Sequence, residues 1–139
     1  MFKRTTFFLT LALTLALAGV ASAAPAAGSA TVVIRHETHG CHSWSVNGDA
    51  FKASQSITLH RGATLTVTNS DVMPHTLILT SGPALRITHA KLAHMGASLK
   101  VTLTRPGTYR FTTKPGEDYM AGVKTTGADN VLRLTVVVT

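Results

Sequence analysis

One short stretch of the sequence concentrates side chains that bind transition metals. Residues 36–42 read HETHGCH and include His39, Cys41 and His42, and Cys41 is the only cysteine of the protein. Imidazole and thiolate groups are strong protein ligands for borderline and soft metal ions. The spacing fits no zinc-finger pattern, which would need a second ligand pair at a set distance. The stretch therefore predicts a source of metal ligands without defining a complete site.

The N-terminal residues have the pattern of an export signal. Lys3 and Arg4 precede an apolar run over residues 7–20, and Ala-Ser-Ala at 21–23 is typical of a cleavage site. This predicts a signal peptide over residues 1–23, a flexible lead-in over 24–30 and one domain over 31–139. The apolar run is short for a membrane anchor, although an uncleaved anchor is the alternative. We expect a secreted or periplasmic protein with no stable membrane anchor after cleavage.

Composition narrows the possible partners. The chain of 139 residues has a formal charge of +7, to which Lys3 and Arg4 of the predicted signal contribute. Its basic residues are scattered and are not interleaved with aromatic residues, so nucleic acid is not an expected partner. A single cysteine cannot form an internal disulfide, which leaves a free thiol, an intermolecular link or a metal ligand.

The chain after the lead-in has the alternation of short strands separated by polar turns. This pattern predicts an all-β Greek-key sandwich of about seven to eight strands. Tight turns at 61–62 and at 105–107 predict two hairpins, each formed by the two strands that flank one turn. The expected strands cover residues 31–34, 56–60, 63–68, 75–80, 98–104, 108–113 and 131–138.

The predicted hairpins place several loops at one end of the sandwich. If the hairpins stack with these ends together, four loops converge, at residues 36–42, 73–75, 94–95 and 117–120. His75 shares a strand face with Leu77 and Leu79, because alternate residues of a strand point the same way. Two interpretations of His75 stay open: a core histidine satisfied by one backbone hydrogen bond, or a metal ligand that faces the loops.

The sequence resembles the cupredoxin superfamily, which includes plastocyanin and pseudoazurin. The resemblance rests on residues 61–71 (RGATLTVTNSD), on Pro74-His75 and on residues 106–111 (PGTYRF), and it spans about residues 31–138. It implies a cupredoxin-like fold and a copper ion held by two histidines, a cysteine and a weak axial methionine. His75 matches the first of these histidines.

The chain departs from the cupredoxin pattern at two implied ligands. The position of the copper-binding cysteine falls on Thr113, and the second histidine falls near Glu117 or Asp118, although Met120 lies near the expected methionine. These two carboxylates are either partners that orient imidazole rings or solvated loop residues. Ligands are thus missing where the superfamily has them and enriched in the early stretch. This predicts a remodelled metal site built from His39, Cys41, His42, His75 and His94.

Softness of the donors favours copper as the cofactor, with zinc as the alternative. We expect an exported copper-binding protein that serves electron transfer or copper handling and that meets a redox or copper-transfer protein. No catalytic triad or carboxylate pair can be argued, so an enzyme is not expected. Two alternatives remain: a metal-free recognition module with the cupredoxin fold, and a structural zinc site.

Overall fold

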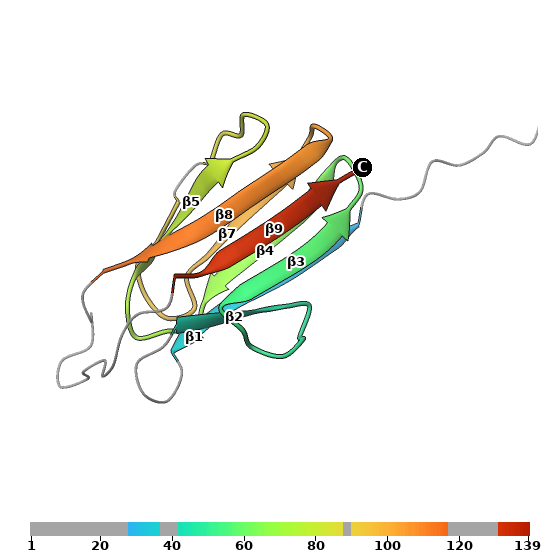
Figure 1. Cartoon of the computed structure of the whole chain (residues 1–139). Helices are drawn as coiled ribbons and strands as arrows, with labels where there is room; N and C mark the ends of the chain where they lie inside the picture. Colours follow the sequence, from blue (N-terminus) through green and yellow to red (C-terminus); the bar gives the residue numbers. More distant parts are fainter. Residues whose placement is uncertain (1–27, 37–41, 88–89, 117–130) are drawn as a thin grey trace, which may run out of the picture.

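The protein is an all-β sandwich. The computed structural model describes residues 28–36, 42–87, 90–116 and 131–139, and none of these residues is helical. Two stacked sheets make up this described part (Figure 1). The predicted all-β fold class is therefore confirmed, whereas the predicted signal peptide over residues 1–23, His39 and Cys41 lie outside the described residues. The part of the chain that is described holds no helix long and apolar enough to cross a membrane.

Mixed strand directions characterise both sheets. The four-stranded sheet has the order β2-β1-β4-β7 and the five-stranded sheet has the order β3-β9-β8-β5-β6. Parallel pairing joins β1 to β4 and β3 to β9, and the other pairs are antiparallel. The strands are β1 (Ser29–His36), β2 (His42–Val46), β3 (Ser54–Leu59), β4 (Ala63–Asn69), β5 (His75–Ser81), β6 (Lys91–Leu92), β7 (Ser98–Leu103), β8 (Gly107–Pro115) and β9 (Arg133–Val138).

The two predicted hairpins are wrong. β3 pairs with β9 and β4 pairs with β1 and β7, so the turn at 61–62 connects the two sheets. The turn at 105–107 likewise connects β7 in one sheet to β8 in the other. A tight turn between two half-buried strands looks the same in the sequence whether the strands pair or face each other across a core. The chain still reverses direction, so the same strand ends meet.

The strand ends near the histidine-rich stretch gather as expected. Ile34 is aligned with Asn69 in the parallel β1–β4 pair, and the backbone N–H of Asn69 donates to the carbonyl of Ala97 just before β7. His75, the first residue of β5, is aligned with Leu92 of β6. The ends of β1 and β4 and the starts of β5 and β7 therefore share one end of the sandwich.

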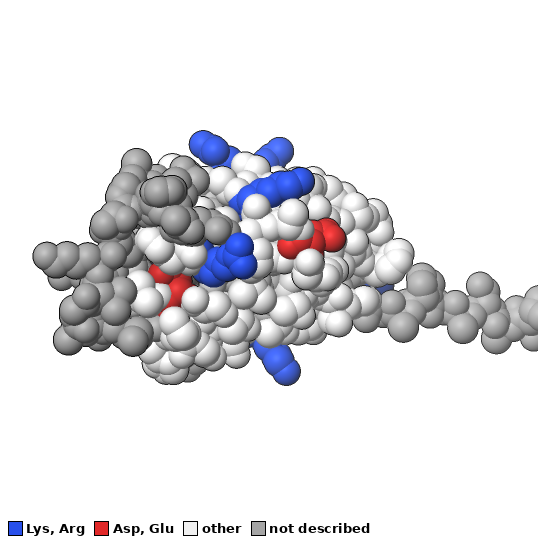
Figure 2. All heavy atoms as spheres, turned by 90° about the horizontal axis from the view of Figure 1, so that it is seen from below, with Lys and Arg blue, Asp and Glu red and all other residues white. Residues whose placement is uncertain are grey.

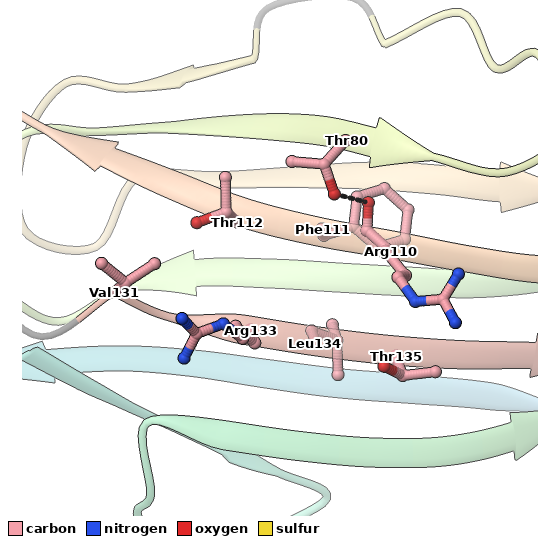
Figure 3. Close-up of a pocket in the computed structure, with 8 residues that line it drawn as sticks. All are labelled: Thr80, Arg110, Phe111, Thr112, Val131, Arg133, Leu134 and Thr135. Carbon is pink, nitrogen blue, oxygen red and sulfur yellow. Dashed lines mark hydrogen bonds between the residues drawn. The ribbon is translucent and has the colours of Figure 1, made fainter.

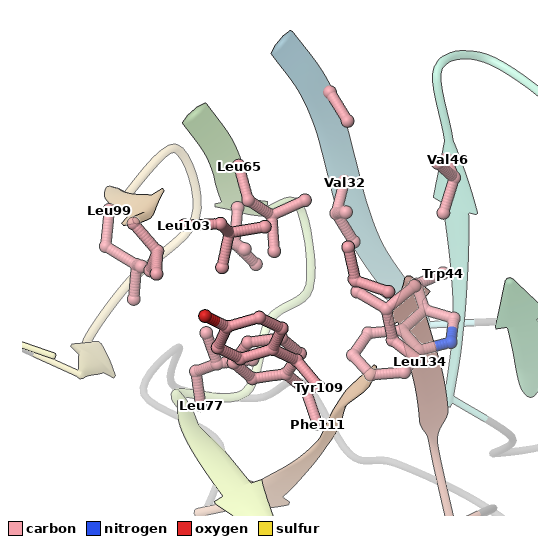
Figure 4. Packing of buried hydrophobic residues seen from close by; sticks show 14 of the residues in the cluster. Val32, Trp44, Val46, Leu65, Leu77, Leu99, Leu103, Tyr109, Phe111 and Leu134 are labelled. Carbon is pink, nitrogen blue, oxygen red and sulfur yellow. The ribbon is translucent and has the colours of Figure 1, made fainter. Parts of the chain in front are cut away.

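The core between the sheets is apolar and continuous. Buried residues alternate with more exposed ones along most strands, whereas all five residues of β2 are buried. The largest buried side chains are Trp44, Tyr109 and Phe111. The rings of Tyr109 and Phe111 are stacked, with centroids 6.3 Å apart. Leu65 of one sheet and Leu134 of the other pack into the same cluster (Figure 4). Burial of these side chains provides the main driving force for folding and a rigid base for the loops at the end.

Basic side chains are spaced over the surface rather than gathered. Figure 2 shows lysine and arginine side chains separated by uncharged surface on the face in view. On this face of the described residues, the distribution agrees with the scattered pattern in the sequence and shows no continuous basic stripe of the kind that follows a nucleic-acid backbone.

Candidate metal centre

A hairpin that the sequence analysis did not predict brings His36 and His42 together. β1 and β2 pair in antiparallel fashion across residues 37–41, and His36 and His42 are direct cross-strand partners. Both alternate with the buried pair Ile34 and Trp44, so the two histidines lie on the same, inward face. Their ring centroids are 5.3 Å apart with an interplanar angle of 70°. His42 is buried, and His36 lies at the partly exposed margin.

A buried carboxylate faces these two rings from the end of β4. Asp71 has a fully buried side chain and follows Asn69, the last residue of β4. The Asn69 side chain accepts a hydrogen bond from the Asp71 N–H at 2.8 Å and donates to the carbonyls of Met73 and Leu92. Asn69 therefore holds both sides of the turn that presents Asp71.

The Asp71 carboxylate is the centre of the cluster. Its Oδ2 lies 3.1 Å from Nε2 of His42 and 2.9 Å from Nε2 of His75. Its Oδ1 accepts a hydrogen bond from the Met73 N–H at 3.1 Å and lies 3.9 Å from Nδ1 of His36. Three imidazoles from three strands thus surround one carboxylate.

His75 lies at the inner side of the cluster. Its side chain is fully buried, and its ring stands nearly perpendicular to that of His42, with centroids 5.0 Å apart. A carboxylate only accepts hydrogen bonds, so the bond to Asp71 requires a proton on Nε2 of His75. Nδ1 of His75 is buried without a hydrogen-bond partner. The core interpretation of His75 expected a single hydrogen bond to the backbone. The structure instead has a hydrogen bond from His75 to the Asp71 carboxylate.

Asp71 stays ionised to low pH. Burial alone would raise the pKa of Asp71, but the contacts with His42 and His75 and the bond from the Met73 N–H hold that pKa well below its usual range. A lowered pKa in the folded state means that Asp71 stabilises the fold above its unfolded pKa. This stabilisation is lost as the pH falls through the folded pKa.

The donor set fits a divalent transition metal. One ligand atom each from His36, His42 and Asp71 lies within 4.8 Å of the others. Two ligand atoms that each lie about 2.1 Å from a metal are about 3.0 to 3.4 Å apart when the ligand–metal–ligand angle is between 90° and the tetrahedral value. The separation of 3.1 Å between His42 and Asp71 falls in that range, and the 3.9 Å between His36 and Asp71 needs a small inward shift of the partly exposed ring. Two imidazoles and a carboxylate are borderline to hard donors, which suit Cu²⁺ and Zn²⁺.

The structure brings together two of the five predicted site residues. His42 and His75 meet at Asp71. His94 is exposed in the loop after β6, and its Nδ1 lies 2.9 Å from the carbonyl oxygen of Met95. His39 and Cys41 lie outside the described residues, as do residues 117–120 with their two carboxylates.

Sequence reasoning missed Asp71 and His36 as members of the site. Asp71 was noted only as part of the cupredoxin-like motif, and His36 was noted only as part of the HETHGCH stretch. A signal for His36 and His42 was present, since apolar residues alternate up to His36 and again from His42, as in Val32, Ile34, Trp44 and Val46. Reading that alternation as a hairpin would have predicted that the two histidines face each other.

Comparison with known proteins finds solved structures that are similar to this chain. No family model matches the sequence, and no curated protein is similar to it. Solved structures similar to the chain include a purple cupredoxin from Nitrosopumilus maritimus (15% identity, 78% of this chain and 98% of that chain, TM-score 0.44). An amicyanin variant has 18% identity, with 78% and 82% of the two chains covered and a TM-score of 0.42. A multicopper oxidase from Campylobacter jejuni has 16% identity over 80% of this chain and a quarter (25%) of that one, with a TM-score of 0.48.

At identities of 13–19% and TM-scores of 0.39–0.48, these similarities assign no family, ligand or function to this chain. The function has to be inferred from the chain's own residues.

Proposed function

We propose that this protein binds a copper ion at the end of the sandwich, through His36, His42 and Asp71. One observation supports the proposal most: ligand atoms of two cross-strand histidines and of a fully buried carboxylate lie within 4.8 Å of one another. A buried carboxylate is costly unless it is paired. Here the carboxylate contacts His42 and His75, and Asn69 Oδ1 accepts a hydrogen bond from the backbone N–H of Asp71, which fixes the turn that carries the carboxylate.

His75 would position the metal-binding carboxylate. Its Nε2–H donates to Oδ2 of Asp71, which fixes the carboxylate and balances part of its charge. Groups that hydrogen-bond to a metal ligand in this way commonly tune the affinity of the site by about 10- to 100-fold. Nδ1 of His75 offers a further lone pair at the inner side of the cluster.

Copper is the first choice of metal and zinc the second. When bound, copper would supply a redox-active cation whose Cu²⁺ state is well matched by nitrogen and oxygen donors. Among the described residues these donors favour storage or transfer of Cu²⁺, that is, copper handling. Electron transfer would require a softer ligand that also stabilises Cu⁺, and Cys41, the residue before His42, is the candidate. Export and a redox or copper-transfer partner remain part of this proposal.

A copper titration of the exported protein tests the proposal. We expect one copper ion per chain, and a loss of affinity of at least about 100-fold in His42→Ala. His60→Ala is the matched control, since His60 is exposed by the turn between β3 and β4. An equal loss in both variants, or no stoichiometric copper in the wild type, would refute the site.

The visible spectrum separates the two roles. A copper–thiolate bond absorbs visible light intensely, so a strong band that disappears in Cys41→Ser would favour electron transfer. A weak band that is unchanged in Cys41→Ser would favour copper handling with nitrogen and oxygen ligands.

One observation favours a metal-free alternative. The carboxylate of Asp71 has favourable contacts within the protein, with His42, His75 and the Met73 N–H. The cluster could therefore serve to hold the loops of a recognition module. A protein that retains no copper or zinc, but unfolds more easily when Asp71 is replaced, would support this alternative.

A further inference from the structure

A pocket lies on the outer face of the five-stranded sheet, over β5, β8 and β9. It has a volume of about 350 Å³ and is lined by residues of these strands and by Val131, which precedes β9. This size is at the lower end of the range for small-molecule sites, roughly 300–1,000 Å³. Figure 3 shows the lining side chains, among them Arg110, Thr112, Val131, Arg133 and Thr135.

Strand register arranges two arginines and two threonines in alternation. Arg110 is aligned with Thr135, and Phe111 is aligned with Leu134, so the next position places Thr112 opposite Arg133. Arg110 and Arg133 are therefore diagonal neighbours on one face, with a Cα separation of about 7–8 Å. The two threonine hydroxyls occupy the other two corners of this four-residue group.

The two arginines have charge without a counter-charge in the described part of the chain. Both side chains are exposed, and neither forms an ion pair with a described residue. Like charges this close on one sheet face repel each other. Figure 3 shows the two guanidinium groups at opposite ends of the pocket. The side chains of Phe111 and Leu134 point into the core, with 2% and 1% exposure, so the pocket floor between the arginines is the backbone of β8 and β9. Val131 adds apolar surface at the rim and is 60% exposed.

We propose that this pocket binds a small dicarboxylate whose two carboxylates are joined by a short apolar chain. Each guanidinium group offers a planar pair of N–H donors that matches one carboxylate. The hydroxyls of Thr112 and Thr135 can donate to the remaining carboxylate oxygens, and the linker spans the pocket floor between the arginines. A dicarboxylate can engage both guanidinium groups at once, whereas a monocarboxylate engages one.

This binding site goes beyond the proposed copper function and shares no residue with the metal centre. Its test is an NMR titration with adipate in the absence of metal, followed through the Nε–H signals of Arg110 and Arg133. Hexanoate is the matched ligand, since it has the same number of carbons and one carboxylate. Total ionic strength is held constant with sodium chloride, because exposed charge pairs are screened by salt.

We expect both arginine signals to shift together with adipate, with an affinity about fivefold or more above that for hexanoate. Arg110→Gln and Arg133→Gln should each lower the adipate affinity about fivefold, to the level of hexanoate. Arg61→Gln removes the same charge at the turn between β3 and β4 and should leave adipate binding unchanged.

Three results would overturn the proposal. The first is no saturable shift with adipate, and the second is equal affinity for adipate and hexanoate. The third is an equal loss in Arg61→Gln, which would mean that adipate responds only to net charge. Copper binding does not enter the measurement, so failure here leaves the metal centre untouched.

Discussion

Replacing Asp71 by Asn tests the electrostatics of the cluster in depth. The substitution keeps the size of the side chain and its place beside Asn69, but removes the negative charge that faces His42 and His75. A hydrogen bond to a charged group contributes about 1.5–3 kcal/mol, and removal of one partner of a buried pair costs about 3–5 kcal/mol. Because Asn can still accept one hydrogen bond, we expect Asp71→Asn to lower the free energy of unfolding by about 3 kcal/mol at neutral pH.

Urea unfolding of the metal-free protein measures this difference. Emission of Trp44, the only tryptophan and a fully buried one, reports the transition. Asp49→Asn is the matched control, since Asp49 is an exposed acid in the loop after β2. It should change stability by less than about 0.5 kcal/mol.

The pH dependence of the stability difference has an expected direction. The pKa of Asp71 is lowered in the folded state, so its stabilisation is complete above the unfolded value of about 3.9 and declines as the pH falls below it. The stability gap between wild type and Asp71→Asn should therefore narrow as the pH falls below about 4. A gap that is absent at neutral pH, or that widens in acid, would refute the assigned role of Asp71.

Two further substitutions test how the cluster is held. His75→Ala should lower copper affinity by about tenfold or more while the protein stays folded, because Asp71 loses the donor that orients it. Competition with a chelator measures this affinity, and an unchanged value would contradict the assigned role of His75. Asn69→Ala should lower the free energy of unfolding by about 2–3 kcal/mol, because the carbonyls of Met73 and Leu92 lose their donor; an unchanged urea midpoint would be the contrary result.

The strands could be predicted from the sequence better than their partners could. Alternation of apolar and polar residues identified most of the strands, because half-buried strands repeat with a period of two. Pairing could not be predicted from that period, since β3 and β4 face each other across the core instead of sharing a ladder. A short turn satisfies both arrangements equally well.

The His–Asp cluster draws on only part of the predicted ligand set. His42 and His75, two of the predicted ligands, lie beside Asp71 at the end of the sandwich where the strand ends converge, and their binding of a metal stays a prediction. Asp71 was missed because an aspartate two residues after a strand usually caps a turn. Its burial follows from long-range contacts with the β1–β2 hairpin and with His75, which no local pattern in the sequence reveals.

Pulsed electron paramagnetic resonance of the Cu²⁺-loaded protein tests the central claim most directly, because it counts the imidazoles bound to copper. We predict two coordinated imidazoles in the wild type, one in His36→Ala and one in His42→Ala, and two in the control His60→Ala. A wild-type spectrum without coordinated imidazole, or one that is the same in all four proteins, would contradict a copper site at His36, His42 and Asp71.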